Sequence, residues 1–285
     1  MTADDVFLAS SRRLFGIAYR MLGQVAEAED AVQETYVRWA RTQQSTVDNP
    51  AAWLTTVVTR ICLDRLKSAQ QQRETYVGTW LPEPLATDDI DPADVAGTSD
   101  SITLAFLVVL ERLSPAERAV FLLHEVFGYQ HTEIAAMLER SPAAVRQLGA
   151  RARRHIAERR PRYEDDSERH RAVTQQFLSA LDGGDLDDLM ALLAPDVTFL
   201  SDGGGVVVAA RRPLHGAQRV ASLILRFAAM RTPEHGVDLR QVNGRPGLVI
   251  SYRGTVEGVW SLDVVDGRIA AVHVVRNPDK LRYVI

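Results

Sequence analysis

Apolar residues recur at helical spacing in the first quarter of the chain. Leu14, Ile17 and Met21 follow one another at intervals of three and four residues, and Gly23 comes shortly after them. This spacing places the side chains on one face of a helix, and glycine commonly ends a helix. The pattern therefore predicts an amphipathic helix that ends at Gly23.

Residues 26–41 predict a second helix with two different faces. Val32, Tyr36 and Trp39 fall on one face and are expected to form its buried stripe. A polar face of this kind is ordinarily solvated, but an ordered set of charges also suits a partner surface. The polar face carries Asp30, Gln33, Glu34 and Arg38.

A third helix is predicted to begin at Asn49-Pro50, because asparagine caps helix N-termini and proline suits the first helical position. Its exposed side carries Arg60 and Arg65, and the polar loop 42–48 precedes it. A basic helix entered from a polar loop suits single-stranded nucleic acid, whose unstacked bases can be captured. We expect Trp53 either to stack on such a base or to lie in the core, as most tryptophans on an apolar face do.

Two further helix starts of the same kind frame a helix-turn-helix. Ser114-Pro115 with Glu117 predicts a capped helix that ends at Gly128, and Ser141-Pro142 predicts another helix start. A short helix is expected between them, over residues 131–138. The last helix has an inward stripe made of Val145, Leu148, Ala152 and Ile156.

The outward face of that last helix is basic. Residues 141–162 contain seven arginines and one acid, Glu158, in a chain whose net charge is only −4. Localised positive charge favours phosphate contact with counterion release, and arginine and glutamine at the start of a recognition helix bond base edges. The alternative is an ordinary solvated face of good helix formers. We expect a DNA-reading face made of Ser141, Ala144, Arg146, Gln147, Ala150, Arg151 and Arg154.

The helical pattern stops between Tyr76 and Asp100. Two prolines interrupt the stretch Trp80-Leu81-Pro82-Glu83-Pro84-Leu85, which predicts a linker over residues 76–100. Its second half is expected to be solvated, or to lie against the basic helices. The acids of that half are Asp88, Asp89, Asp91, Asp94 and Asp100.

From about residue 163 the pattern changes to α+β. Three helices against a curved sheet predict a cone with an internal cavity. We expect helices over 168–181, 186–193 and 217–230, and strands over 195–202, 206–210, 237–243, 247–253, 256–265 and 268–275, with Gly203-Gly204-Gly205 as a break and Asp266-Gly267 as a hairpin turn.

Candidate chemistry in the cone is limited to three side chains, Asp202, His215 and His273, as general bases. His273 shares a strand face with Ile269 and Val275 and is expected to point into the cavity. No spacing fixes two catalytic groups around one substrate. A structural histidine is therefore favoured, and we expect no enzymatic activity, cofactor or metal site.

Composition narrows the class of protein. With 285 residues, of which 46% are hydrophobic, the chain is expected to form more than one packed domain. The longest apolar run, 102–110, is shorter than the roughly 20 residues of a membrane helix, and the N-terminus has no basic region followed by an apolar core. Cys62 is the only cysteine, which excludes an internal disulfide, and we expect it in the core. These features predict a cytoplasmic protein without a membrane partner.

Four stretches in the first half resemble the extracytoplasmic-function (ECF) sigma factors in order and spacing, over about 155 residues. They are AEDAVQETY (28–36), NPAAWL (49–54), LSPAERAVFLL (113–123) and AVRQLGARAR (144–153). The resemblance implies a sigma-2 domain over 1–75, the linker, and a sigma-4 domain over 101–162. It also implies that core RNA polymerase binds the polar face of the second helix, that Asn49, Trp53, Arg60 and Arg65 open and read the −10 element of promoter DNA, and that the last helix reads the −35 element.

The second half resembles the group of these sigma factors that carries its own SnoaL-like extension, here residues 163–285, of the ketosteroid-isomerase type. The resemblance rests on Trp80-Leu81-Pro82, Asp202-Gly203-Gly204-Gly205 and Asn277-Pro278-Asp279-Lys280-Leu281. It implies that the cone controls the sigma factor in place of a separate anti-sigma protein, and it leaves any small-molecule ligand unassigned. Val206 stands where the group commonly has lysine, so the role of that lysine does not carry over.

Two other classes of protein fit parts of this pattern. One is a one-component regulator in which the cone senses a small molecule and the helix-turn-helix binds operators. The other is an isomerase or hydrolase fused to a DNA-binding module. The ordered polar face of residues 26–41 and the basic third helix favour a sigma factor over the one-component regulator, because a simple regulator needs neither. A ligand assay on the isolated cone would test the second alternative.

Overall fold

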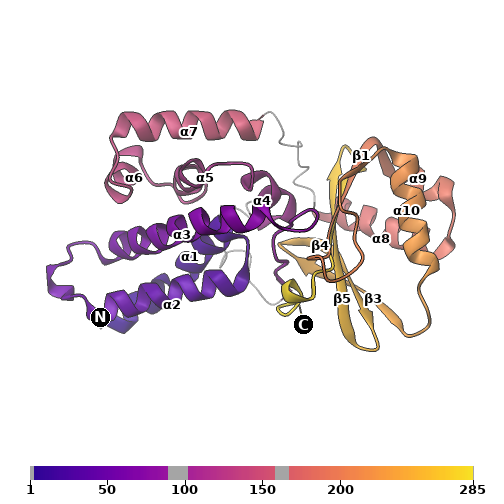
Figure 1. Cartoon of the computed structure of the whole chain (residues 1–285), viewed down its shortest axis with the longest axis horizontal. Coiled ribbons are helices and arrows are strands. Elements are labelled where there is room, and N and C mark those ends of the chain that lie inside the picture. Colours follow the sequence, from indigo (N-terminus) through magenta and orange to yellow (C-terminus); the bar gives the residue numbers. More distant parts are fainter. Residues whose placement is uncertain (1–2, 89–101, 158–166, 285) are drawn as a thin grey trace. The chain divides into compact units, whose positions relative to one another are not determined.

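The computed structural model describes residues 3–88, 102–157 and 167–284 (Figure 1). The chain divides into two compact units. Of the described residues, 3–74, 102 and 106–157 form a helical unit. Residues 75–88, 103–105 and 167–284 form a unit built on a β-sheet, called the sheet unit below.

Three helices form the first half of the helical unit: α1 (Ala3–Leu22), α2 (Val25–Arg41) and α3 (Pro50–Glu74), with a 3₁₀ turn at Gln44–Thr46 before α3. Each helix packs against the other two. The backbone N–H of Ala52 donates to Asn49 Oδ1 at 3.1 Å, so Asn49 caps α3 as its position before proline predicts. Cys62 lies fully buried in this core.

The second half of the helical unit contains α4 (Leu104–Leu110), α5 (Pro115–Phe121), α6 (His131–Met137) and α7 (Pro142–Ala157). Ser114 and Glu117 form the predicted capping box, in which Ser114 N donates to Glu117 Oε2 at 3.1 Å and Glu117 N to Ser114 Oγ at 3.4 Å. After α5 the chain continues as one π-helical turn before Gly128. The predicted helix-turn-helix is confirmed.

The predicted buried stripe of α2 is partly wrong. Trp39 is buried, but Tyr36 is 39% exposed and Val32 only half-buried. The buried side instead contains mainly small residues, because α2 packs closely against two helices at once. Tyr36 lies at the rim, with its ring 4.9 Å from that of Phe7. The residues buried on α2 are Val25, Ala28, Ala31, Thr35 and Trp39.

Hydrogen bonds from two arginine side chains, one in each half, join the two halves of the helical unit. The buried Arg118 donates to the carbonyl oxygen of Met21 at 2.6 Å. Arg60 Nε, on α3, donates to the carbonyl oxygen of Met137, at the end of α6, at 2.9 Å. Helix α3 packs on α5, and α5 packs on α7. The two halves therefore form a single body in this structure.

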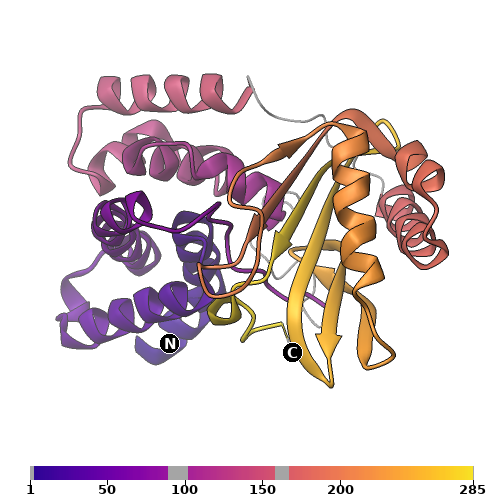
Figure 2. The ribbon, with the colours of Figure 1, turned by 45° about the vertical axis from the view of Figure 1, so that its right-hand side comes forward.

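The sheet unit has a six-stranded sheet in the order β2-β1-β6-β5-β4-β3, in which β1 and β6 run parallel and the other neighbours antiparallel. Figures 1 and 2 show α10 lying across the curved sheet. This is the predicted α+β cone. Its elements are α8 (Ser167–Gly183), α9 (Leu186–Leu192), β1 (Leu193–Asp202), β2 (Leu214–His215), α10 (Ala217–Ala229), β3 (His235–Val242), β4 (Arg245–Tyr252), β5 (Thr255–Val265), β6 (Arg268–Val275) and a 3₁₀ turn at Pro278–Lys280.

The predicted strand over residues 206–210 is wrong. The backbone N–H groups of Val206 and Val207 both donate to the Gly203 carbonyl oxygen, which makes a tight turn directly after β1. Val206 and Val208 are 69% and 81% exposed, so their apolar character does not reflect burial in a sheet. The strand that pairs with β1 at this edge is the short β2.

The predicted linker is not free along its first half. Residues 75–88, called the linker segment below, run along the sheet unit. Thr87 N donates to the Gln241 carbonyl oxygen at 2.9 Å, and Ala86 forms an antiparallel bridge with Val242. Asp88 accepts from Arg240 Nε at 2.9 Å, which places one acid of the linker on the sheet unit. The other linker acids, Asp89, Asp91, Asp94 and Asp100, lie outside the described residues.

Candidate functional site

The predicted DNA-reading residues lie on the outer side of α7. Ser141, Arg146, Gln147, Ala150, Arg151 and Arg154 are exposed and Ala144 is half-buried, whereas the four stripe residues are buried against the rest of the helical unit. Three of the seven arginines counted in the sequence, Arg159, Arg160 and Arg162, lie outside the described residues.

Two arginines of α7 hold it in place and others remain available. Arg151 Nε lies 2.9 Å from Glu117 Oε1, and Arg153 Nη1 lies 2.9 Å from Glu125 Oε1. Burial by itself would raise the pKa of Glu117, but hydrogen bonds from Ser114 and Arg151 lower the pKa below its ordinary value. Among the described residues, Arg146 has no ion-pair partner and is free to meet an anion.

The polar face of α2 connects to the basic side of α3. Asp30 and Gln33 are exposed. Glu34 accepts from Arg38 at 2.6 Å and from Arg65 at 3.3 Å. A residue predicted to contact polymerase and one predicted to contact the −10 element are therefore held together by the same carboxylate.

The other predicted −10 residues are engaged within the helical unit. Trp53 is half-buried, with its ring 5.3 Å from that of Trp39. Arg60 forms a 2.9 Å ion pair with Glu139, in addition to its bond to Met137. The second half of the unit therefore holds a side chain that is predicted to contact the −10 element.

A buried carboxylate brings together the three motifs of the second half. Asp202 is completely buried. It accepts hydrogen bonds from Tyr76 Oη at 2.6 Å, from the backbone N–H of Leu81 at 2.9 Å and from Gly204 N at 2.9 Å. Lys280 Nζ lies 2.7 Å from Asp202 Oδ2, the oxygen that also accepts from Leu81. Four donors around one buried charge fit the requirement that buried ions be paired and hydrogen-bonded.

Lys280 contacts the linker segment as well as Asp202. Its Nζ donates to the Leu81 carbonyl oxygen at 2.6 Å and lies 4.0 Å from the centre of the Trp80 ring. Asn277 Nδ2 donates to Tyr76 Oη at 3.0 Å. Burial and the hydrogen bond to Asp202 raise the pKa of Tyr76, which remains a neutral donor. We call Tyr76, Trp80, Leu81, Asp202, Asn277 and Lys280 the Asp202–Lys280 cluster.

The remaining motif residues shape this cluster. A Cβ on Gly204 would lie 2.5 Å from the Asn277 side chain, and its φ of +64° favours glycine. A Cβ on Gly203 would lie 2.4 Å from the Val207 carbonyl oxygen, and Gly205 also has a positive φ. Pro82 and Leu281 are buried beside these residues, while Pro278 and Asp279 are exposed. Sequence reasoning did not single out Tyr76, although it lies just after the third helix.

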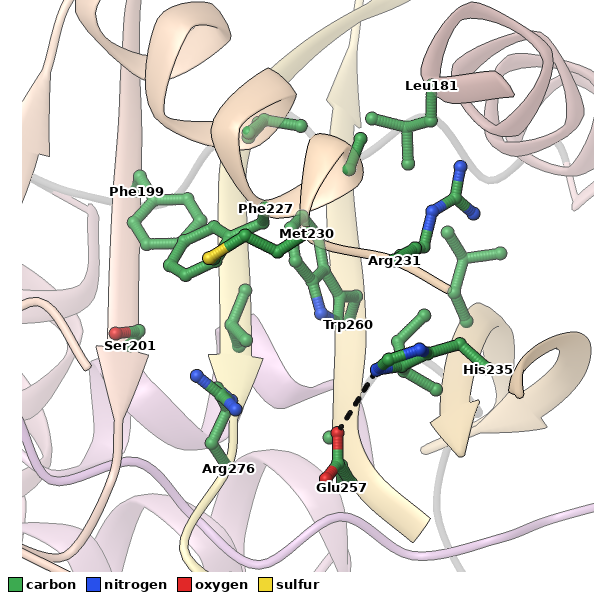
Figure 3. Close-up of a pocket in the computed structure, with 16 residues that line it drawn as sticks. Leu181, Phe199, Ser201, Phe227, Met230, Arg231, His235, Glu257, Trp260 and Arg276 are labelled. Carbon is green, nitrogen blue, oxygen red and sulfur yellow. Dashed lines mark ion pairs between the residues drawn. The ribbon is translucent and has the colours of Figure 1, made fainter. Parts of the chain in front are cut away.

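The cone has a cavity of about 130 Å³, partly open to solvent, on the face of the sheet that α10 covers (Figure 3). Phe199, Phe227 and Trp260 line one end. At the other end His235 Nε2 lies 3.8 Å from Glu257 Oε2. Sequence reasoning predicted a cavity but none of these residues, because their positions depend on which strands pair.

None of the three predicted general bases lines this cavity, so that expectation is wrong. Asp202 is in the cluster, and His215 is exposed, 3.2 Å from Thr198 Oγ1. Pairing of Phe199 with Val272 and of Ser201 with Val274 puts Val272 and Val274 on the cavity side, so His273 points to the opposite face. There its Nδ1 lies 3.7 Å from Asp263 Oδ2. Burial lowers the pKa of His273 to about 4 and raises that of Asp263 to about 8.

Within the described ranges no helix is long and apolar enough to cross a membrane. The same part of the chain contains no group of three or more histidine, cysteine or acidic side chains arranged to hold a metal ion.

Comparison with known proteins identifies the class to which these features belong. Residues 6–72 match the family model for sigma-70 region 2, and residues 103–156 match that for sigma-70, region 4. The helical unit is thus formed by the two DNA-binding regions of a sigma factor.

Relatives match nearly the full chain. ECF RNA polymerase sigma factor SigJ of Mycobacterium tuberculosis is 39% identical over 96% of this chain and 91% of its own length. Its crystal structure covers 96% of this chain and 96% of its own, with a TM-score of 0.79 and 37% identity. The ECF sigma factor SigG of the same species is 29% identical over 90% of this chain and 75% of its own length. The chain belongs to the ECF RNA polymerase sigma factors, which bind core RNA polymerase and promoter DNA.

Proposed function

We propose that this sigma factor is controlled by its own C-terminal cone, which takes the place of a separate anti-sigma protein. The observation that carries the proposal is the Asp202–Lys280 cluster, because it fastens the chain between regions 2 and 4 to the cone. The cone then serves as a regulator and not as an enzyme.

We further propose which helices of the helical unit bind DNA and which bind core polymerase. Helix α7 reads the −35 element, with Arg146 and Gln147 at base edges and Arg154 at phosphates. Arg151 would reach a phosphate through its Nη groups, while its Nε stays on Glu117. This assignment is supported by their exposure on a capped helix and by the free guanidinium of Arg146. Ser141 at the helix start would meet a phosphate through its hydroxyl and backbone.

For region 2, we propose that the exposed face of α2 around Asp30 and Gln33 binds core polymerase, and that the α3 side of the region binds the −10 element. Glu34 orients Arg38 and Arg65 between these surfaces. Arg60 would act on DNA only after it leaves Met137 and Glu139. In this proposal, region 2 reads the −10 element only after separating from region 4.

Distances along promoter DNA support the need for separation. Elements centred 25 base pairs apart lie about 85 Å apart on B-DNA at 3.4 Å per base pair. In this structure α3 packs on α5 and α5 on α7. Packed helices have axes about 8–10 Å apart, so α7 lies within roughly 20 Å of α3. The closed helical unit cannot occupy both elements.

The linker segment controls how far the regions can separate. Fully extended, the 27 residues from 75 to 101 can span at most about 95 Å. When residues 75–88 are held on the sheet unit, their own end-to-end distance is set by the sheet, and the 13 residues from 89 to 101 can add at most about 45 Å to it. Because the cone is tethered, its effective concentration reaches the millimolar range and a modest docking energy suffices.

The test compares the full chain with Asp202→Asn and with a chain lacking residues 277–285. Both changes are expected to increase promoter-directed transcription by purified core polymerase. Both are also expected to increase the distance between fluorescent labels at Ser45→Cys and Ala157→Cys, two exposed positions; buried Cys62 does not compete for the label. Unchanged transcription together with an unchanged distance would refute control by the cone and leave the sigma-factor assignment intact.

A further inference from the structure

The cavity of the cone has an aromatic end built from three rings. The centres of Phe199 and Phe227 lie 6.4 Å apart, and Trp260 meets them edge-on at 6.1 Å and 6.3 Å. Figure 3 shows these three side chains grouped at one end of the pocket. Rings in such an arrangement offer both faces and edges to a further planar ring.

The size of the cavity limits what can enter. Its volume is about 130 Å³. An apolar protein cavity of roughly 150 Å³ holds one benzene molecule. One six-membered ring with a small substituent therefore fits within it.

The other end of the cavity supplies hydrogen-bond donors. Arg276 lies at this end and is half-exposed. Within the described part of the chain it has no carboxylate partner. Its Nη1 donates only to the Val208 carbonyl oxygen, at 2.8 Å. Trp260 Nε1 also has no acceptor among the described residues, and this atom is accessible from the cavity. An accessible indole N–H can donate to an incoming acceptor.

The other arginine at the cavity is already paired. Arg231 forms a 2.7 Å ion pair with Asp182, whereas Glu257 Oε2 lies 3.8 Å from His235 Nε2, a contact that is an ion pair only when His235 is protonated. Arg276 is therefore the cavity arginine that has no carboxylate partner among the described residues. An aromatic site can also attract a cation, but the guanidinium of Arg276 repels one.

We propose that this cavity binds a small aromatic carboxylic acid, with its ring against Phe199, Phe227 and Trp260 and its carboxylate on Arg276 and the indole N–H of Trp260. A guanidinium recognises a carboxylate with paired, charge-assisted hydrogen bonds. This inference concerns a ligand site and does not depend on control by the cone.

Titration calorimetry on the full chain tests it with benzoate, its neutral analogue benzamide and benzyltrimethylammonium. Benzoate is expected to bind with a Kd below about 1 mM, a modest affinity for a ligand of this size. Benzamide and the ammonium compound should bind at least tenfold more weakly. Equal binding of benzoate and benzamide, or stronger binding of the cation, would overturn the acid assignment, and absence of benzoate binding at 10 mM would overturn the site.

Variants of the cavity test which side chains bind the carboxylate of benzoate. Arg276→Gln should weaken benzoate at least tenfold and leave benzamide unchanged, whereas Arg276→Lys should restore part of the affinity because it keeps the charge. Trp260→Phe keeps the ring, removes the N–H and should weaken benzoate by a smaller factor. Arg219→Gln, an exposed position of α10 outside the cavity lining, is the matched control and should bind as the parent does. If Arg276→Gln binds benzoate as well as the control, the proposal is wrong.

Discussion

Lys280→Met removes one charge of the Asp202–Lys280 cluster and keeps most of the volume of the side chain. In the parent chain Lys280 is 5% exposed and bonds both Asp202 and the Leu81 carbonyl oxygen. The variant leaves the Asp202 carboxylate buried, with only Tyr76, Leu81 and Gly204 as donors. Two of these three donors belong to the linker segment, so the lost contacts weaken its docking.

The free-energy cost of Lys280→Met follows from the burial of the Asp202–Lys280 ion pair. Removing one partner of a buried ion pair costs about 3–5 kcal/mol. Three remaining donors keep the carboxylate partly satisfied, so the lower end, about 3 kcal/mol, applies here. At about 1.4 kcal/mol per tenfold change, the undocked fraction of the linker segment should rise roughly 100-fold.

Amide hydrogen exchange measures this fraction directly, because Leu81, Leu85 and Thr87 each donate their backbone N–H to the sheet unit. In Lys280→Met these amides should exchange about 100-fold faster, while amides in β4 and β5 keep the parent rate. Unchanged β4 and β5 exchange distinguishes undocking of the segment from unfolding of the cone.

Two further variants complete the experiment. Lys67→Met changes the exposed lysine that pairs with Asp64 and should exchange as the parent does. The double variant Asp202→Asn/Lys280→Met removes both buried charges and should recover part of the protection. Parent-like exchange of Leu81 and Thr87 in Lys280→Met, with an intact cone, would refute the assignment of docking energy to this pair.

Three other predictions address separate parts of the chain. Arg146→Ala should weaken −35 binding by about 1–3 kcal/mol if it reads a base, seen in promoter affinity across a salt titration, whereas an equal loss on all sequences would indicate a phosphate contact. Asp30→Arg should reduce pull-down of core polymerase without changing the melting temperature; we prefer it to a change at Glu34, which would break two ion pairs. Burial of His170, despite its bond to the Leu262 carbonyl oxygen, lowers its pKa in the folded chain. The unfolded chain therefore binds more protons below about pH 6.5, and stability should fall as pH drops; His170→Gln should flatten that slope in thermal melts, and an identical slope would refute the attribution.

Local signals in the sequence predicted most of the helical unit. Capping at Asn49 and Ser114 and the stripe of α7 depend on neighbours within one or two turns, so the sequence contains the information needed to identify them. The α2 stripe was misassigned because Tyr36 and Trp39 look alike in a periodic pattern. Only the packing of α2 against two other helices decides that Trp39 is buried and Tyr36 lies at the rim.

In the sheet unit, the sequence by itself determined the strands with clear alternation and the turn glycines, and the three motifs were recognisable as motifs. What it could not determine was the side of the sheet to which each residue points. A shift of one residue in strand pairing reverses every side chain, so the placement of His273 away from the cavity depends on how β1 and β6 pair. The meeting of Tyr76, Asp202 and Lys280 is likewise a tertiary result, since 126 residues separate Tyr76 from Asp202 and 78 separate Asp202 from Lys280, and only the folded sheet brings these buried polar groups within hydrogen-bonding distance.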